Sequence, residues 1–142
     1  MAETATWYTH GLAAFMRGEI ALLQDTIKVA LLGSTYTPSQ SHASWSDVSS
    51  HEVSGTGYTA GGEALSNKGI TPDTNNIRST FDADDVTWDN SEITARYAVL
   101  YDDTASGKPL IALVNFGEEK SSSNGSFTIQ WHADGILRLD AS

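Results

Sequence analysis

The sequence predicts a mainly β protein: a single-domain antiparallel β-sandwich of the jelly-roll type, with one α-helix at the N-terminus. Turn residues recur about every 8–12 residues between short segments of alternating apolar and polar side chains, a pattern typical of sandwiches and barrels. The length of 142 residues fits one domain spanning 1–142. Only the first stretch of the chain spaces its apolar side chains as a helix does.

The N-terminal helix is expected at about 4–17. Thr4 or Thr6 is the candidate N-cap, and Gly18 is the expected stop. Gly11 weakens this prediction, because glycine inside a helix costs about 1 kcal/mol relative to alanine. The apolar stripe that predicts the helix comprises Trp7, Gly11, Ala14 or Phe15, and Met16.

The remainder of the chain is expected to form strands. Residues 26–34 begin with alternation and become continuously apolar, as in a buried strand. Residues 93–101 are apolar on one face, and Ala98 and Leu100 make the other face partly apolar, so this strand is expected at the centre of a sheet. The other expected strands are 63–70, 77–81, 84–88, 110–116, 126–132 and 135–140. The expected loops and turns are 36–51, 72–76, 89–91, 102–109 and 117–125.

The stretch SGTGYTAGGEAL, residues 54–65, raises the question of a phosphate-binding loop. It contains G-x-G-x-x-A, but a dinucleotide fingerprint needs a preceding strand and a following helix, and neither pattern flanks it. In the phosphate-loop spacing, Glu63 stands where lysine is required. The sequence therefore favours a structural turn in which glycine lets the backbone bend or approach a neighbour. The expected turn glycines are Gly55, Gly57, Gly61 and Gly62.

Charge and composition exclude several classes of partner and site. The net charge is −10, and the 8 basic residues are scattered singly, so no basic stripe is available for nucleic acid or an anionic membrane. The absence of cysteine excludes disulfides, thiolate catalysis and cysteine-based metal sites. No apolar run approaches the roughly 20 residues of a spanning helix. We therefore expect no nucleic-acid partner and no membrane partner.

No motif in the sequence carries catalysis. The stretch FDADDVTWDN, residues 81–90, offers only the opening D-x-D of an EF-hand loop, and aspartate is also a common turn residue. The 4 histidines lack metal-ligand spacing, and neither H-E-x-x-H nor G-x-S-x-G occurs. We predict no catalytic residue, no cofactor and no metal. The alternatives left open are a metal at the acidic clusters and a glycosidase pair among the 18 acidic residues.

Aromatic side chains are the candidates for contact with a partner, because they combine a large apolar surface with a polar tip. Trp88 and Trp131 occupy inward phases of expected strands, so they are predicted to be core residues. The candidate interface residues are Trp7, Tyr8, Phe15 and Trp45.

Several segments together resemble a family of small virion proteins of tailed bacteriophages. The likeness runs in order over nearly the whole chain, and it implies a particle component rather than an enzyme. It carries no catalytic or ligand residue onto this sequence. The segments are DTIKVALL (25–32), EVSGTGYTAGG (52–62), FDADDVTW (81–88), ITARYAVLYDD (93–103), SSSNGSFTIQW (121–131) and GILRL (135–139).

The resemblance, the size and the charge lead to an expected function. Small acidic β-sandwich proteins on phage heads resemble jelly-roll cement or decoration proteins, which bind between major capsid subunits as dimers or trimers. We expect a non-enzymatic structural protein of the phage head, assembled in the host cytoplasm, whose partners are the major capsid protein and further copies of itself. The alternative is a tail, fibre or connector component that binds a receptor or glycan through its aromatic side chains.

Overall fold

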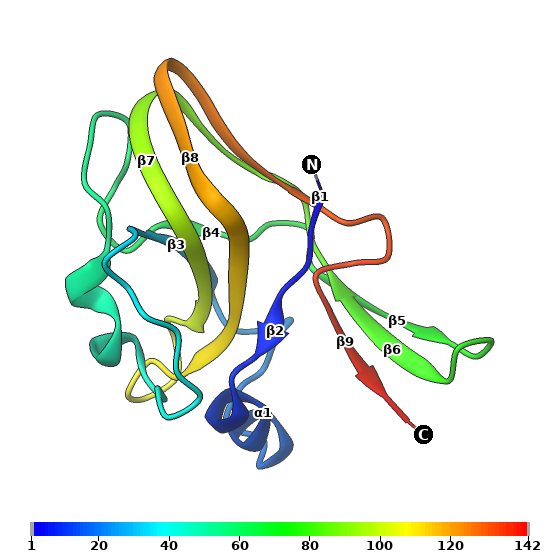
Figure 1. The fold of residues 1–142 in the computed structure, drawn as a ribbon. Coiled ribbons are helices and arrows are strands. Elements are labelled where there is room, and N and C mark those ends of the chain that lie inside the picture. The colour runs from blue at the N-terminus through cyan, green and yellow to red at the C-terminus, as the bar shows by residue number, and fades with distance from the viewer. Residues whose placement is uncertain (1, 142) are drawn as a thin grey trace.

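The structure is a computed structural model that describes residues 2–141 (Figure 1). Within this range the chain is mainly β, and its one α-helix, α1, spans Thr9–Met16. The strands are β1 (Ala2–Glu3), β2 (Thr6–Trp7), β3 (Ile27–Leu32), β4 (Glu63–Ala64), β5 (Gly69–Asp73), β6 (Arg78–Asp82), β7 (Val86–Asp102), β8 (Leu110–Trp131) and β9 (Leu137–Asp140). Two short 3-10 helices, Trp45–Asp47 and Ser49–His51, lie in the expected loop 36–51.

The strands form two sheets. The larger sheet has six strands in the order β1-β8-β7-β3-β4, with β2 also paired to β8, and the smaller has three in the order β5-β6-β9. All pairings are antiparallel except that of β1 with β8. The predicted β-sandwich with one N-terminal helix is confirmed, whereas its jelly-roll type stays a prediction.

A single long hairpin, β7–β8, organises the sandwich. Its two strands bend over together at the top of Figure 1, so the six-stranded sheet folds back on itself. Each of the two strands therefore contributes to both layers of the sandwich. Phe116 and Phe127, on the two halves of β8, face each other with ring centroids 6.1 Å apart. The turns predicted at 89–91 and 117–125 are therefore wrong, because the strands continue through both segments. The turn-forming residues there produce shifts in register instead, with positive φ at Asn90, Gly117 and Asn124.

The prediction of a central strand at 93–101 is confirmed by its burial on both faces. Ala98 and Leu100 are fully buried in one hydrophobic core cluster. Val99 and Tyr101 are buried in a second cluster on the outer face, which the loop 36–51 covers. Backbone pairing with β3 satisfies the strand's polar groups on one side, and β8 satisfies them on the other.

The N-terminal helix is shorter than the predicted 4–17. Residues 4–8 are extended, because β2 pairs with β8, so neither Thr4 nor Thr6 is the N-cap. The Thr9 backbone N–H donates instead to the Gln40 side chain, at 2.6 Å. The predicted stop at Gly18 is confirmed: its φ is 78°, and the chain closes the helix with the backbone bonds of a Schellman motif.

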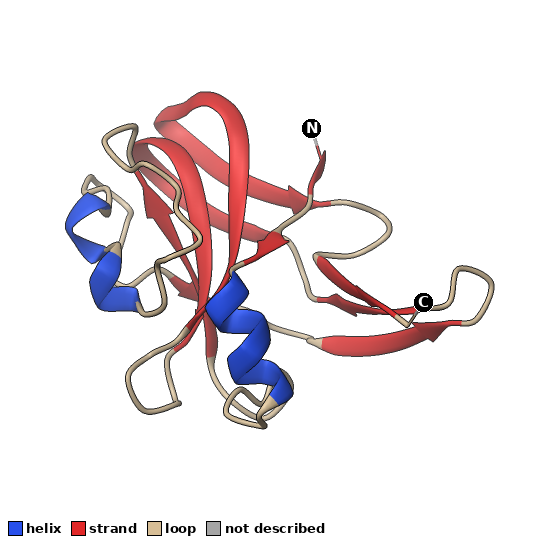
Figure 2. Ribbon diagram, turned by 60° about the horizontal axis from the view of Figure 1, so that its bottom comes forward, coloured by secondary structure: helices blue, strands red, loops and turns tan. Residues whose placement is uncertain are grey.

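The predicted strand 63–70 is also wrong, since its two ends belong to different sheets. β4 pairs with β3 in the sandwich, whereas β5 begins at Gly69 and pairs with β6. The smaller sheet, β5-β6-β9, projects away from the sandwich in Figure 2, and we call it the projecting sheet. Pro72, expected in a turn, lies in its edge strand β5, where a missing N–H is tolerated. Within residues 2–141, no helix has the length and apolar character needed to cross a bilayer.

Candidate functional site

The register of the projecting sheet separates its side chains into an apolar and a polar face. Residues directly opposite each other in an antiparallel pair share a face. The apolar face carries Ile70, Phe81 and Leu137 in one row and Pro72, Ser79 and Leu139 in the next. The polar face carries Thr71, Thr80 and Arg138 in one row and Asp73, Arg78 and Asp140 in the next.

A groove lies between the apolar face and the N-terminal part of the chain. Its volume is about 70 Å³, and we call it the apolar groove. The Trp7 and Phe15 rings lie 5.5 Å apart in its wall, and the Trp7 indole Nε1 donates to the Arg138 backbone oxygen at 3.3 Å. The large apolar side chains that line it are Trp7, Phe15 and Leu22 from the N-terminal side and Ile70, Phe81, Leu137 and Leu139 from the projecting sheet.

Two of the exposed large apolar side chains lie at the apolar groove, where they form its exposed rim. Ile70 and Leu139 line the groove and are 44% and 38% exposed. Met16 and Leu23, which are 75% and 42% exposed, each follow a lining residue in the sequence. The one other exposed large aliphatic side chain among residues 2–141 is Ile77, in the β5–β6 turn. Clustered apolar exposure of this kind marks a contact surface.

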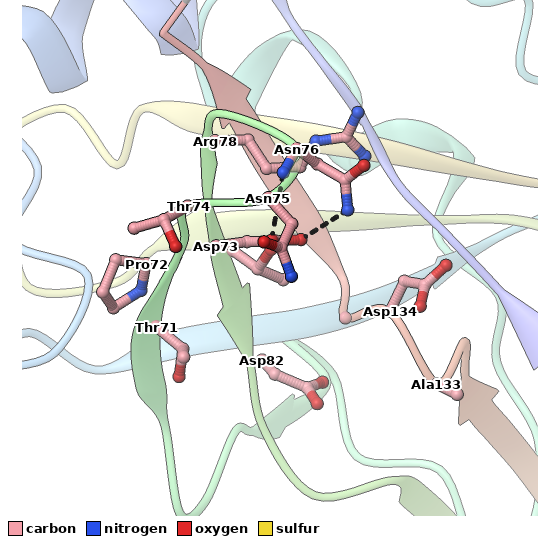
Figure 3. Close-up of a pocket in the computed structure, with 12 residues that line it drawn as sticks. Thr71, Pro72, Asp73, Thr74, Asn75, Asn76, Arg78, Asp82, Ala133 and Asp134 are labelled. Carbon is pink, nitrogen blue, oxygen red and sulfur yellow. Dashed lines mark hydrogen bonds between the residues drawn. The ribbon is translucent and has the colours of Figure 1, made fainter.

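The opposite side of the projecting sheet borders a polar cleft of about 500 Å³ (Figure 3). Asp73 accepts hydrogen bonds from the backbone N–H and the side-chain Nδ2 of Asn76, and these bonds hold the pKa of Asp73 below its usual value. The Arg78 guanidinium Nε lies 3.2 Å from an Asp140 carboxylate oxygen. These side chains are therefore engaged in closing the β5–β6 turn and joining β6 to β9.

The acidic clusters singled out in the sequence are separated by the fold. No three histidine or acidic side chains of residues 2–141 gather where one metal ion could bind them. Asp85 accepts a hydrogen bond from the Trp131 backbone N–H, and Asp89 accepts one from the Ser126 hydroxyl, at 2.9 Å each. These carboxylates tie β7 and the segment before it to β8.

One pair of carboxyl groups is brought together, Asp25 and Asp102. Asp102 is fully buried, and its Oδ1 accepts hydrogen bonds from the backbone N–H groups of Thr104 and Ala105. Burial and the hydrogen bond with Asp25 raise the pKa of Asp102 to about 6, and the same bond lowers the pKa of Asp25. The two groups lie where backbone hydrogen bonds of Thr26 with Thr104 and Asp103 fasten the β7–β8 turn to the segment before β3.

Of the predicted interface residues, the structure brings Trp7 and Phe15 together in the wall of the apolar groove, both half-buried. Tyr8 is only 1% exposed, and its hydroxyl lies 2.7 Å from that of Tyr36. Its side chain is thus a core residue of its own chain and is not available to a partner. Trp45 is half-buried, and one face of its ring stacks on Tyr101 at 4.5 Å.

Three of the four turn glycines, Gly55, Gly57 and Gly62, lie where the backbone of their own sheet comes too close for a side chain. A Cβ on Gly55 would lie 2.2 Å from the Glu92 backbone oxygen, and one on Gly62 would lie 1.9 Å from that of Val29. Gly57, Gly61 and Gly62 all have positive φ. The stretch 54–65 therefore lies against β3 and β7 as a structural turn, and Gly55, Gly57 and Gly62 face protein backbone.

Sequence reasoning missed the exposed side chains that line the apolar groove, Ile70 and Leu139. The alternation of Leu137 and Leu139 was a signal for a strand with one apolar face, but it does not say what covers that face. Comparisons of the chain with protein-family models, with curated proteins and with solved structures found no match.

Proposed function

We propose that this chain is a non-enzymatic structural protein of a tailed-phage virion, acting as a cement or decoration protein that binds between major capsid subunits and stabilises the head. The observation that carries the proposal is the exposed rim of the apolar groove, since a surface of this kind is completed by another protein. The resemblance to virion proteins supplies the setting.

The physical basis of such a role is linkage. A protein that binds the expanded capsid lattice, and not its disrupted form, stabilises the lattice by mass action. Small interfaces repeated over many sites add to this effect through multivalency. A net charge of −10 favours neutral or basic protein surfaces as partners over other acidic ones.

The alternative is a glycan-binding place on the tail, for which Trp45 is the candidate platform: its side chain is half-buried, and its ring stacks on Tyr101 through one face. Binding to host cells that Trp45→Ala weakens would favour the tail over the head.

The proposal is tested with expanded heads that lack the protein. Purified chain is added, the heads are sedimented, and their resistance to heat is measured with and without it. We expect saturable binding and a higher disruption temperature. Leu139→Glu should weaken binding because it places a carboxylate in the apolar groove, whereas Ile77→Glu, at an exposed site outside the groove, should bind as the native chain does. Heads that neither bind the native chain nor gain heat resistance would show the proposal to be wrong.

A further inference from the structure

One asparagine in the sequence, Asn124, is followed directly by glycine. The carbonyl carbon of an asparagine side chain lies within reach of the backbone nitrogen of the next residue. Glycine has no side chain to shield that nitrogen, so an Asn-Gly pair is open to reaction with itself. The other asparagines precede residues that carry a side chain: Asn67, Asn75, Asn76, Asn90 and Asn115.

The structure places Asn124 in a β-bulge of β8. The register shifts between the pairs Ser91–Gly125 and Ile93–Ser122, so β8 has one residue more than β7 between them. Asn124 has a φ of 50°, and its side chain is exposed. A bulge interrupts the regular ladder of hydrogen bonds, so the Asn124 side chain can turn toward the following backbone nitrogen while the neighbouring pairs stay formed.

Three of the other asparagine side chains are held by hydrogen bonds. Asn67 and Asn76 each donate from Nδ2 to an aspartate, and Oδ1 of Asn115 accepts a backbone N–H at 2.8 Å. An amide engaged in this way must break its bond before its carbon can be attacked. Sequence and structure together therefore single out Asn124.

We propose that Asn124 is a site of spontaneous deamidation in the folded chain. The backbone nitrogen of Gly125 attacks Cγ of Asn124, and the bond from Cγ to Nδ2 breaks. The amide group leaves as ammonia, taking up the proton that the Gly125 nitrogen gives up, and a five-membered imide remains. One water molecule then opens the ring. Attack of water at Cγ gives aspartate, and attack at the backbone carbonyl carbon gives isoaspartate.

Both products change the surface of the β7–β8 hairpin. Each adds one negative charge to a chain whose net charge is −10, within the uncharged stretch SSSNGS, residues 121–126. Isoaspartate also lengthens the backbone by one carbon. Because the bulge already accommodates an extra residue, we expect the sandwich to keep its fold after the reaction. The change depends on the age of the molecule and is independent of the proposed function.

Asp134, which precedes Gly135, is an internal comparison for the reaction. Ring closure there requires the Gly135 backbone nitrogen, which donates to the His132 oxygen at 2.9 Å. An ionised carboxylate is also a poorer electrophile than an amide. Isoaspartate should therefore accumulate faster at position 124 than at position 134.

The test is peptide mass spectrometry of the full chain, incubated below its unfolding temperature at neutral and at mildly alkaline pH. We expect Asn124 to be converted with time, and faster at the higher pH, because the attacking nitrogen must lose its proton. An aspartate-specific protease distinguishes the products, since it does not cleave at isoaspartate. Asn124→Gln should abolish the conversion at this position, because its longer side chain closes a six-membered ring less readily.

Gly125→Ala is the matched control variant. Among the described residues outside its chain neighbours, a Cβ at position 125 would meet only the Ser123 backbone oxygen, at 3.8 Å, so alanine fits without a clash. Its methyl group hinders attack by the nitrogen. We expect conversion of Asn124 to slow several-fold in this variant, with conversion at Asp134 and the midpoint of urea unfolding unchanged.

A parallel incubation in urea shows whether the folded bulge permits the reaction. Conversion of Asn124 in the folded chain that Gly125→Ala slows would support the inference. Conversion only in the unfolded chain, equal conversion at Asn67 or Asn76, or an unchanged rate in Gly125→Ala would overturn it. None of these measurements involves phage heads, so each outcome leaves the proposed function to its own test.

Discussion

Burial and the nearby carboxyl group of Asp25 raise the pKa of Asp102, so two acidic side chains meet where the β7–β8 turn is fastened to the segment before β3. Oδ1 of Asp102 receives two backbone N–H groups, while its buried Oδ2 has no N–H or O–H donor among the described residues. A proton on one carboxyl group is therefore needed to relieve the repulsion between them.

This relationship predicts how stability depends on pH. The pKa of Asp102 is raised from 3.8 to about 6, so its contribution to the free energy of unfolding is present below about pH 4 and is lost as the pH rises through about 6. Asparagine at position 102 can still accept the two backbone N–H bonds, and its side-chain amide N–H can donate to the Asp25 carboxylate without the uptake of a proton. We expect it to be more stable than the native chain at pH 8, by on the order of 1–3 kcal/mol, with a smaller difference at pH 4.

Urea unfolding at both pH values measures the effect of Asp102→Asn. Asp25→Asn at the neighbouring position is the companion variant, and it should also raise stability at pH 8 by removing one of the two charges. Equal stability of Asp102→Asn and the native chain at pH 4 and pH 8 would contradict the raised pKa of Asp102.

Gly62 and Gly61 offer a matched pair of substitutions in the turn 54–65. Both have positive φ, so alanine at either costs about 1–2 kcal/mol in backbone strain. A Cβ on Gly62 would also lie 1.9 Å from the Val29 oxygen, whereas one on Gly61 would come no closer than 3.4 Å to the Tyr101 hydroxyl. We expect Gly62→Ala to lower the free energy of unfolding by at least about 2 kcal/mol more than Gly61→Ala does. Equal losses in chemical denaturation would refute this account of the turn.

Gly11→Ala should reverse the ordinary rule for helices. Alanine is the better helix former by about 1 kcal/mol. In α1, however, a Cβ at position 11 would lie 2.3 Å from the Leu110 backbone oxygen and would push the helix off β8. We expect the free energy of unfolding, measured by thermal or urea denaturation, to fall by about 1–3 kcal/mol in total. A gain in stability would mean that α1 does not pack on β8 in this way.

Trp7→Phe tests the connection between the N-terminal segment and the projecting sheet. Phenylalanine retains a ring beside Phe15 but loses the indole hydrogen bond to the Arg138 oxygen. We expect the free energy of unfolding to fall by about 0.5–1.5 kcal/mol. The substitution should also speed amide hydrogen exchange more in β6 and β9 than in β3. Exchange that is unchanged in β9 would show that this bond does not hold the projecting sheet in place.

The sequence was informative where periodicity reports burial directly. The doubly apolar pattern of 93–101 identified a central strand, and Gly18 identified the end of α1, because both signals are local. Asn90 and Gly117 led to wrongly predicted turns, because residues that accept positive φ occur in β-bulges as well as in chain reversals. Only the pairing with the partner strand distinguishes a bulge from a turn.

The apolar groove could not be predicted for a different reason. It joins Phe15 on α1 to Ile70 and Leu139 on the projecting sheet, and no local pattern shows that these segments meet. Gly11 held a partial signal, since a glycine in a helix suggests a close approach. From the sequence alone, Ile70 and Leu139 are indistinguishable from ordinary core residues, and only the fold shows that no other described part of the chain covers them.

The long β7–β8 hairpin has a consequence for how the chain folds. Its strands are joined only by the short turn 103–109. The most extensive strand pairing in the molecule therefore begins by closing a small loop, which costs little chain entropy. Once the hairpin has formed, both layers of the sandwich have a strand pair on which β1 and β3 can assemble. We expect the hairpin to be the folding nucleus, and its arch to make the two layers unfold as one cooperative unit.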